Sequence, residues 1–332
     1  MIDTQPRSID MPGSGGPVLS IVVPMFNEAS NLPAFFARLL PAIEAIGLDY
    51  EVVCVDDGSS DDTRGHLVAL RGQNRRIKVV GLSRNFGKEV ALTAGLRYSR
   101  GAAVVPIDAD LQHPPELVRE FVAKWHEGFD VVYAFRRNRD IESPLKRLGA
   151  RAFYWIFDKL ADVRMPRDAG DFRLMDRRVV DVINTMPERS RFMKGIFAWV
   201  GFRQTGIPFD PDPRIGGHSG WGVRRLVHFA IDGLTAFSNF PLIAWAYFGA
   251  VVAIISLLAG AYFIIQTIVS GIDVPGYASL IVAILFFGGL QLLTLGIIGG
   301  YLGRVFEEVK RRPLYVVSQT WGFEEADTHE SG

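Results

Sequence analysis

The sequence is poor in cysteine, and its positive and negative charges cancel. Cys54 is the only cysteine among 332 residues, so the chain cannot form an intrachain disulfide. It lies in an apolar run and is predicted to pack as a small buried hydrophobe. Lysine plus arginine number 36, as do aspartate plus glutamate, and the resulting zero formal charge argues against nucleic acid as the main partner.

Several common ligand-binding motifs are also missing. No Gly-x-Gly-x-x-Gly follows the first apolar run, and no Gly-x-x-x-x-Gly-Lys occurs, which disfavours a dinucleotide-binding fold and a P-loop. The sequence has no His-Glu-x-x-His and no Cys/His spacing of a zinc site. It also has no internal repeat. A binding site must therefore be sought in other patterns.

Charge is almost absent from residues 233–303. Between Asp232 and Arg304 the only charged residue is Asp273. The runs 241–269 and 277–302 each exceed the ~20 residues that cross a bilayer core. Two uncharged runs of this length favour a two-helix transmembrane hairpin over residues 241–303 instead of a buried soluble hairpin.

Basic residues flank the predicted hairpin on both outer sides. Arg224 and Arg225 precede it and Arg304 follows it, whereas the turn between the two runs has no lysine or arginine. The positive-inside rule therefore predicts a multi-pass protein of the cell inner (plasma) membrane, with the N-terminal domain and both termini in the cytoplasm.

The remaining segments complete the predicted domain organisation. Residues 1–17 read as a disordered arm and not as a signal peptide, since they are rich in Pro, Gly, Ser and Asp. We expect a cytoplasmic domain over 18–220, an interfacial amphipathic helix over 221–240, and a basic segment with a polar tail over 304–332.

Short apolar runs alternate with helical patterns in the N-terminal domain. The runs predicted to be strands are 19–24, 52–55, 77–82, 103–107 and 131–134. Strict alternation predicts an α/β fold, with a parallel sheet covered by helices on both faces. In such sheets ligands bind beyond the carboxyl ends of the strands.

Two carboxylates follow the fourth run, one residue apart. Alternate side chains of a strand share a face, so Asp108 and Asp110 are predicted to point the same way. Such a pair suits a hard divalent cation that also binds phosphates. A solvated, Asp-rich turn is the alternative. His113 is a candidate ligand beside the pair, although a capping or solvated role is favoured.

Further polar patterns allow two interpretations each. Asp168, Asp171 and Arg173 lie on the two sides of Gly170, where they suit either a functional site or a structural ion pair. The basic, amphipathic stretch 136–160 suits a helix on the sheet or a helix at the membrane surface. The glycine-rich loop 210–221 suits an anion site or a surface linker.

Taken together, the motifs resemble a known family. The stretches Ile21–Glu28, Val55–Thr63 and Asp108–Gln112 resemble the GT-A fold of family-2 glycosyltransferases. The stretches Ser83–Lys88 and Asp168–Met175, with the two apolar runs, are similar to the membrane-bound polyisoprenyl-phosphate glycosyltransferases, such as dolichol-phosphate mannose synthases and bactoprenol glucosyltransferases. The resemblance covers about residues 18 to 312. It implies a Rossmann-like GT-A domain followed by interfacial helices and two transmembrane helices.

The resemblance also implies an activity. It implies inverting transfer of a sugar from a nucleotide-sugar, with UDP-glucose as our choice, to a polyisoprenyl (undecaprenyl or dolichyl) monophosphate at the cytoplasmic face of the membrane. Mg²⁺ or Mn²⁺ on the donor diphosphate would act as a Lewis acid. The implied partners are the nucleotide-sugar, the polyisoprenyl phosphate, membrane lipid and further copies of the chain, but no nucleic acid.

Roles for individual residues follow from the same resemblance. The implied catalytic residues are Asp171, which orients the acceptor or takes a residual proton, and Asp110. The implied metal ligands are Asp108, Asp110 and Gln112. The residues implied to bind the nucleotide-sugar are Pro24, Asn27, Glu28, Asp56, Asp57, Lys88 and Asp108. The residues implied to hold phosphates of donor or acceptor are Arg137, Arg151, Arg173, Arg214 and Ser219.

One position departs from the family pattern. The family commonly has a lysine before the aromatic residue of the loop that precedes the first span, and here Gly220 stands in its place. Arg224 or Arg225 is a candidate to supply the missing phosphate contact. Two alternatives remain: a processive polysaccharide synthase, disfavoured by only two spans and no Gln-x-x-Arg-Trp, and a catalytically inactive membrane scaffold, disfavoured by the intact acidic pair.

Overall fold

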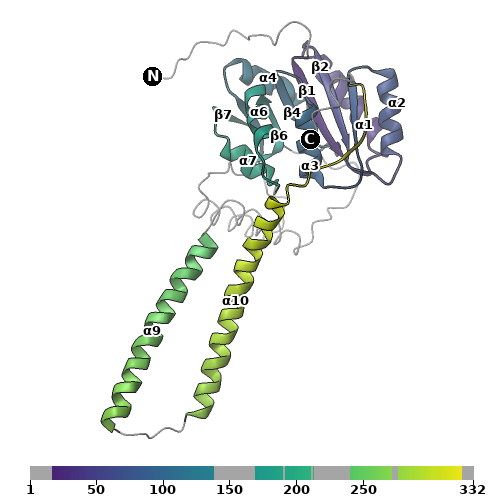
Figure 1. The fold of residues 1–332 in the computed structure, drawn as a ribbon. Helices are drawn as coiled ribbons and strands as arrows, with labels where there is room; N and C mark the ends of the chain where they lie inside the picture. The colour runs from purple at the N-terminus through teal and green to yellow at the C-terminus, as the bar shows by residue number, and fades with distance from the viewer. Residues whose placement is uncertain are drawn as a thin grey trace. The chain divides into compact units, whose positions relative to one another are not determined.

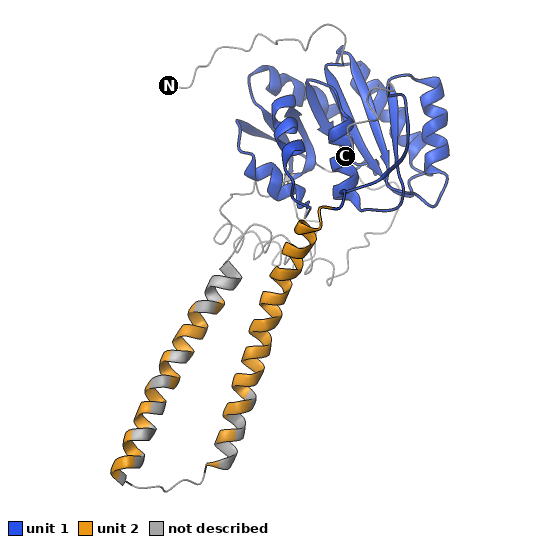
Figure 2. Ribbon diagram, in the orientation of Figure 1, with its two compact units in different colours: residues 1–159, 163–229, 312–332 blue, residues 160–162, 230–311 orange. Residues whose placement is uncertain are grey.

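The computed structural model describes residues 17–137, 169–189, 191–210, 212, 240–270 and 276–323. Several predictions lie outside the described residues: those for Arg151, Arg214, Ser219 and Gly220, the arm before residue 17, and the interfacial helix up to residue 239. The chain divides into two compact units (Figure 2). We call them the sheet unit (residues 1–159, 163–229 and 312–332) and the helix unit (160–162 and 230–311).

The sheet unit is built on one sheet with the strand order β7-β5-β6-β4-β1-β2-β3-β8 (Figure 1). The strands are β1 (Leu19–Met25), β2 (Tyr50–Asp56), β3 (Ile77–Leu82), β4 (Ala103–Pro106), β5 (Val131–Arg136), β6 (Ala169–Asp176), β7 (Gln204–Phe209) and β8 (Val317–Trp321). All five predicted strands are confirmed, because each apolar run lies buried in the sheet.

The prediction of a purely parallel sheet is wrong. Strand β1 pairs in parallel with β2 and β4, as expected, and β2 with β3. Strand β6, however, enters between β4 and β5 and is antiparallel to both, and β8 is antiparallel to β3. The sheet is therefore mixed. The antiparallel entry of β6 has a consequence for the site, since the beginning of β6 lies beside the end of β4.

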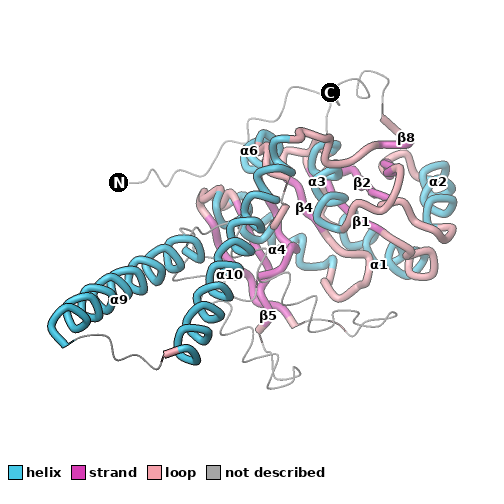
Figure 3. The backbone as a smooth tube through the Cα atoms, turned by 60° about the horizontal axis from the view of Figure 1, so that its bottom comes forward, coloured by secondary structure: helices cyan, strands magenta, loops and turns pink. Residues whose placement is uncertain are grey.

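Helices cover both faces of the sheet, as predicted. They are α1 (Leu32–Glu44), α2 (Thr63–Gln73), α3 (Lys88–Tyr98), α4 (Val118–His126), α6 (Arg177–Thr185) and α7 (Met193–Trp199), with a 3-10 turn, η1 (Pro115–Leu117), before α4. Figure 3 gives a second view of the sheet and these helices.

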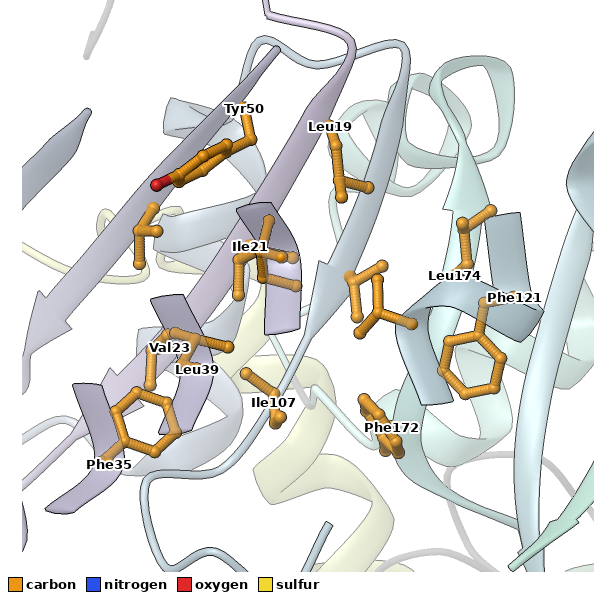
Figure 4. Packing of buried hydrophobic residues seen from close by; sticks show 14 of the residues in the cluster. Leu19, Ile21, Val23, Phe35, Leu39, Tyr50, Ile107, Phe121, Phe172 and Leu174 are labelled. Atoms are coloured by element: carbon orange, nitrogen blue, oxygen red, sulfur yellow. The ribbon is translucent and has the colours of Figure 1, made fainter. Parts of the chain in front are cut away.

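The larger core lies between the sheet and helices α1 and α4. Phe35 of α1 and Phe121 of α4 are completely buried with Ile21 of β1 (Figure 4). Each such side chain contributes roughly 1.5–3 kcal/mol through its removal from water. On the other face α3 approaches β1 so closely that a Cβ on Gly95 would lie 2.3 Å from Val22. Cys54 is fully buried, which confirms its predicted role.

Strand β8 was not predicted. It follows the helix unit in the chain, yet it forms one edge of the sheet, where Val79 pairs with Trp321 and Leu82 with Val317. Ser318 also donates a hydrogen bond to the carbonyl of Gly81, at 2.9 Å. The sheet is therefore completed by residues 317–321, from the segment expected to be only a basic stretch and tail.

The helix unit consists mainly of α9 (Phe240–Ser270) and α10 (Tyr277–Val309). Within the described part of the chain, one segment is long and apolar enough to cross a membrane, Phe286–Val309, and none of its most apolar window is buried. The described part of α9 contains a shorter apolar stretch, Tyr247–Ser256. The two-span hairpin is therefore not confirmed and stays a prediction.

Trp245 of α9 donates a hydrogen bond to the hydroxyl of Thr294 in α10. Helix α10 contains two Gly-x-x-x-Gly steps, a spacing that permits close approach of helices, yet Cβ atoms added to their four glycines would meet no described atom within 4 Å. These are Gly296, Gly299, Gly300 and Gly303.

Candidate active site

The strand order brings the predicted polar residues to one edge of the sheet. Strands β4, β1 and β2 are neighbours, so the segments after their carboxyl ends lie side by side. These segments carry Asp108 and Asp110, Asn27 and Glu28, and the Asp56–Asp57 pair. Because β6 is antiparallel to β4, Asp171 at the beginning of β6 reaches the same edge.

Asp56 and Asp57 hold the surrounding loops in place. Asp56 is fully buried and accepts hydrogen bonds from the Ser59 amide (3.0 Å) and from Arg64 Nε (2.7 Å). Asp57 accepts from the amides of Phe86 (2.7 Å) and Gly87 (2.8 Å), which fixes the loop between β3 and α3. Burial raises the pKa of Asp57 despite these two hydrogen bonds. Gly87 has φ +102°, a conformation open to glycine, and the loop delivers Lys88 to the site.

The segment after β1 is fixed in a similar way. Asn27 has φ 57°, and its side-chain oxygen accepts a hydrogen bond from the amide of Ser60, at 2.8 Å. The amide of Glu28 donates to the hydroxyl of Thr63, at 2.9 Å. Burial raises the pKa of Glu28, and the charges of Asp110 and Asp108 raise it further, against the hydrogen bond from Asn31. The negative charges of the acidic pair therefore extend to Glu28 and make its ionisation less favourable.

Asp108 and Asp110 approach each other through a turn. Strand β4 ends at Pro106, so the predicted reason, alternation along a strand, is wrong. Leu111 adopts φ 57°, and the amide of Gln112 donates to Asp110 Oδ1 at 3.1 Å, which closes the turn. Asp108, Asp110 and His113 each offer one ligand atom, and these atoms lie within 4.8 Å of one another.

His113 belongs to this cluster, and of the two favoured predictions, a capping or a solvated role, the solvated role is wrong. Its side chain is only 12% exposed, because the ring packs against Phe172 and Phe209 with centroid distances of 5.1 and 5.6 Å. Burial lowers its pKa, although the charges of Asp108 and Asp110 oppose this. Nδ1 lies 3.9 Å from an Asp108 oxygen and has no hydrogen-bond partner within the described structure.

Lys88 links the acidic pair to Asp171. Its ammonium lies 2.8 Å from a carboxylate oxygen of Asp108 and 2.9 Å from Asp171 Oδ2. Pro24 and Phe172 line the small recess beside these groups. Burial opposes ionisation of Asp171, but the charges of Lys88 and Lys194 outweigh it and hold the pKa of Asp171 well below its usual range.

Comparisons with known proteins show the family of the chain. Residues 20–183 match the family described as "Glycosyl transferase family 2". An uncharacterized glycosyltransferase of Synechocystis is 54% identical over 306 residues, which cover 92% of this chain and 96% of that protein. The chain belongs to glycosyltransferase family 2.

Two further proteins are similar to this chain. A prophage-derived bactoprenol glucosyl transferase of Shigella flexneri is 42% identical over 302 residues, 91% of this chain and 98% of that protein. Among solved structures, mannosyl-3-phosphoglycerate synthase from Rubrobacter xylanophilus is similar with a TM-score of 0.47 and 20% identity, over 66% of this chain and 72% of its own.

Two arginines predicted to hold phosphates in this family-2 enzyme have partners of their own. Arg173 is 3% exposed, donates to the carbonyl of Gly170 at 2.7 Å and stacks over Phe197, with 4.0 Å to the ring centroid. Burial lowers its pKa to about 10. Arg137 is largely exposed and lies 3.9 Å from Asp210. Their phosphate contacts stay predictions, and Arg173 has a clear structural role in supporting the beginning of β6.

The prediction from sequence missed two charged residues near the site. Glu89 is the second residue of α3, and burial together with the charge of Asp171 raises its pKa to about 8, against Lys88 and Lys194. Lys194 of α7 acts through its charge on Asp171 and Glu89. An acidic residue in the first turn of a helix is ordinary, and nothing in the sequence around Lys194 pointed to a site.

Proposed function

We propose that the protein transfers a sugar, with UDP-glucose as the expected donor, from a nucleotide-sugar to a polyisoprenyl monophosphate, with inversion at the anomeric carbon. The observation that carries this proposal is the likeness to bactoprenol glucosyl transferases, which spans 91% of the chain at 42% identity. The cluster of Asp108, Asp110 and His113 at the edge of the sheet supports it, because its ligand atoms suit a divalent cation, which would bind the diphosphate of such a donor.

The donor atoms at this edge fit Mg²⁺ or Mn²⁺. Two carboxylates are ligands that both ions accept, and an imidazole nitrogen suits Mn²⁺ as well. The unpartnered Nδ1 of the buried His113 supports a ligand role for this residue beside Asp108 and Asp110. Gln112 remains a predicted ligand through its side chain. When bound, the metal would neutralise charge on the leaving nucleoside diphosphate.

The acceptor chemistry needs little help from a base. A phosphate monoester has a second pKa near ~6 and is mostly ionised at neutral pH. One of its oxygens attacks the anomeric carbon, the bond from that carbon to the donor diphosphate breaks, and the negative charge passes to the leaving group. Asp171, whose pKa is held low, is a poor proton acceptor, so we propose that it orients Lys88 and the acceptor.

The membrane arrangement belongs to the same proposal. The apolar segment Phe286–Val309 supports a membrane-bound protein. We propose that it is a multi-pass protein of the inner membrane, with the sheet unit and both termini in the cytoplasm, where nucleotide-sugars are made. We also propose a homo-oligomer, because the Gly-x-x-x-Gly steps of α10 permit close approach of helices and a Cβ added to any of their glycines would meet no described atom of the same copy within 4 Å.

The test is incubation of the purified protein with radiolabelled UDP-glucose, GDP-mannose or UDP-N-acetylglucosamine and undecaprenyl phosphate. We expect a metal-dependent, lipid-linked monosaccharide from UDP-glucose. A long glycan would instead identify a processive synthase. No lipid-linked product from any donor, with and without Mn²⁺, would contradict the proposal and favour an inactive scaffold.

A further inference from the structure

Lys88 shares a carboxylate with the candidate metal site. Its ammonium contacts Asp108 at 2.8 Å and Asp171 at 2.9 Å, so two negatively charged carboxylates share one positive charge. Asp108 is at the same time one of the three residues of the metal-binding cluster. A divalent ion and the ammonium would therefore compete for one carboxylate.

The backbone of Lys88 is fixed, but its ammonium is able to move. The loop before it is held by the two amide hydrogen bonds to Asp57, and Lys88 begins helix α3. The side chain is 46% exposed and has a flexible four-carbon stem. The ammonium can therefore leave Asp108 without any change in the fold, and it keeps Asp171 as its second partner.

We propose that Lys88 is an internal competitor for the metal site: the metal displaces its ammonium from Asp108, and the ammonium then pairs with the diphosphate of the donor. This inference rests on the proposed function. It gives Lys88 two opposite effects, because the residue weakens the binding of the metal alone but strengthens the binding of the metal–nucleotide complex.

The size of the competition follows from the charges. A monovalent and a divalent cation about 5 Å apart repel each other enough to weaken metal binding about tenfold, even in surroundings as polar as water. Removal of the ammonium also leaves Asp108 and Asp171 without their shared counter-charge, which favours a cation further.

The experiment measures Mn²⁺ affinity of the full-length protein in detergent from the electron paramagnetic resonance signal of free Mn²⁺. Lys88→Met is expected to bind Mn²⁺ about tenfold more tightly than the wild type. With saturating Mn²⁺, the same variant is expected to bind UDP about tenfold more weakly. Lys88→Gln is a second neutral variant, in case Lys88→Met does not fold.

Two further lysine variants separate this competition from general electrostatics. Lys194→Met removes a charge that acts on Asp171, and Lys124→Met removes one from the exposed pair with Glu127 on α4. We expect Mn²⁺ affinity to change less than threefold in the first and not at all in the second. Equal tightening in Lys88→Met and Lys194→Met would overturn the competition for Asp108.

The remaining outcomes distinguish this inference from the proposed function. If Asp110→Asn abolishes Mn²⁺ binding while both neutral variants of Lys88 bind Mn²⁺ as the wild type does, the inference is wrong and the metal site stands. If Asp110→Asn leaves Mn²⁺ binding unchanged, the metal site itself is wrong, and the inference is refuted with it.

Discussion

The two units of the chain differ in where their apolar side chains lie. In the sheet unit, large apolar side chains such as Leu39 and Phe121 are buried, and the charged groups of the site are positioned by hydrogen bonds and ion pairs. In the helix unit, apolar side chains face outward: Leu302 of α10 is 64% exposed and Ile268 of α9 is 79% exposed. The first unit is stabilised by its own buried core, whereas the exposed apolar side chains of the second require an apolar environment that the described residues do not provide.

The polar edge of the sheet unit should govern catalysis without governing the fold. Asp110→Asn removes one carboxylate of the metal cluster and is expected to lower transfer to the lipid phosphate at least ~100-fold. Its unfolding temperature should match that of the wild type, because Asp110 is not part of the buried core.

Asp62→Asn is the matched control for this substitution. Its side chain is 76% exposed and lies outside the metal cluster, so near-normal turnover is expected. A fully active Asp110→Asn protein would contradict the role of the acidic pair, whatever its stability.

The membrane assignment of the helix unit can be tested by labelling single cysteines. The native Cys54 is buried, which raises the pKa of its thiol, so we expect it not to react with the maleimide. In intact spheroplasts, a membrane-impermeant maleimide is expected to label Asp273→Cys, in the turn between the apolar runs, and to spare Thr328→Cys in the C-terminal tail.

After lysis both cysteines should react. Labelling of Thr328→Cys in intact spheroplasts, or equal protection of both positions, would contradict the proposed topology of two spans with cytoplasmic termini.

The same truncation in both units tests the contrast directly. Leu39→Ala in the sheet unit empties a fully buried position and is expected to lower the free energy of unfolding by about 2–5 kcal/mol. Leu302→Ala in the helix unit is expected to change it by less than about 0.5 kcal/mol in detergent. Denaturant unfolding of the two variants, followed by tryptophan fluorescence and circular dichroism, gives both values. A similar loss in both variants would show that α10 is packed inside a protein core.

Local patterns were sufficient to predict the parallel part of the sheet and its polar edge. Apolar runs such as Val52–Val55 identify buried strands, and carboxylates directly after a strand must lie at its end. The position of β6 was not predictable, because a strand that returns antiparallel between β4 and β5 depends on the packing of the whole sheet. Strand β8 is short and partly polar, and its partner strand β3 lies more than 230 residues earlier in the chain.

The site shows the same division between local and distant causes. The acidic pair was predicted from the local spacing of Asp108 and Asp110. The burial of His113, in contrast, depends on Phe172 of β6 and Phe209 of β7, which only the folded chain brings together. The raised pKa of Glu89 likewise depends on Asp171, 82 positions later in the sequence.

The smallest expected effect is a pH dependence of stability within the sheet unit. Burial and the charge of Asp171 raise the pKa of Glu89 from 4.5 to about 8, so the folded protein keeps the proton where the unfolded chain has lost it. The contribution of Glu89 to the free energy of unfolding is therefore fully present below pH 4.5, and it declines as the pH rises toward 8. Glu89→Gln, which cannot ionise, should be as stable as the wild type at pH 4.5. At pH 8.5 it should be more stable than the wild type and should unfold at a higher temperature.

Glu116 provides a control with the opposite sign. The hydrogen bond from Arg38 outweighs burial and lowers the pKa of Glu116, so its contribution is present above the pKa of the unfolded chain and is lost as the pH falls through the folded value. Glu116→Gln should therefore be less stable than the wild type at pH 8.5, and the difference should shrink in acid. Thermal unfolding at both pH values measures the two slopes. If Glu89→Gln and Glu116→Gln shift stability in the same direction, Glu89 is not held protonated by the site, and the negative potential around Asp171 is weaker than the arrangement of charges implies.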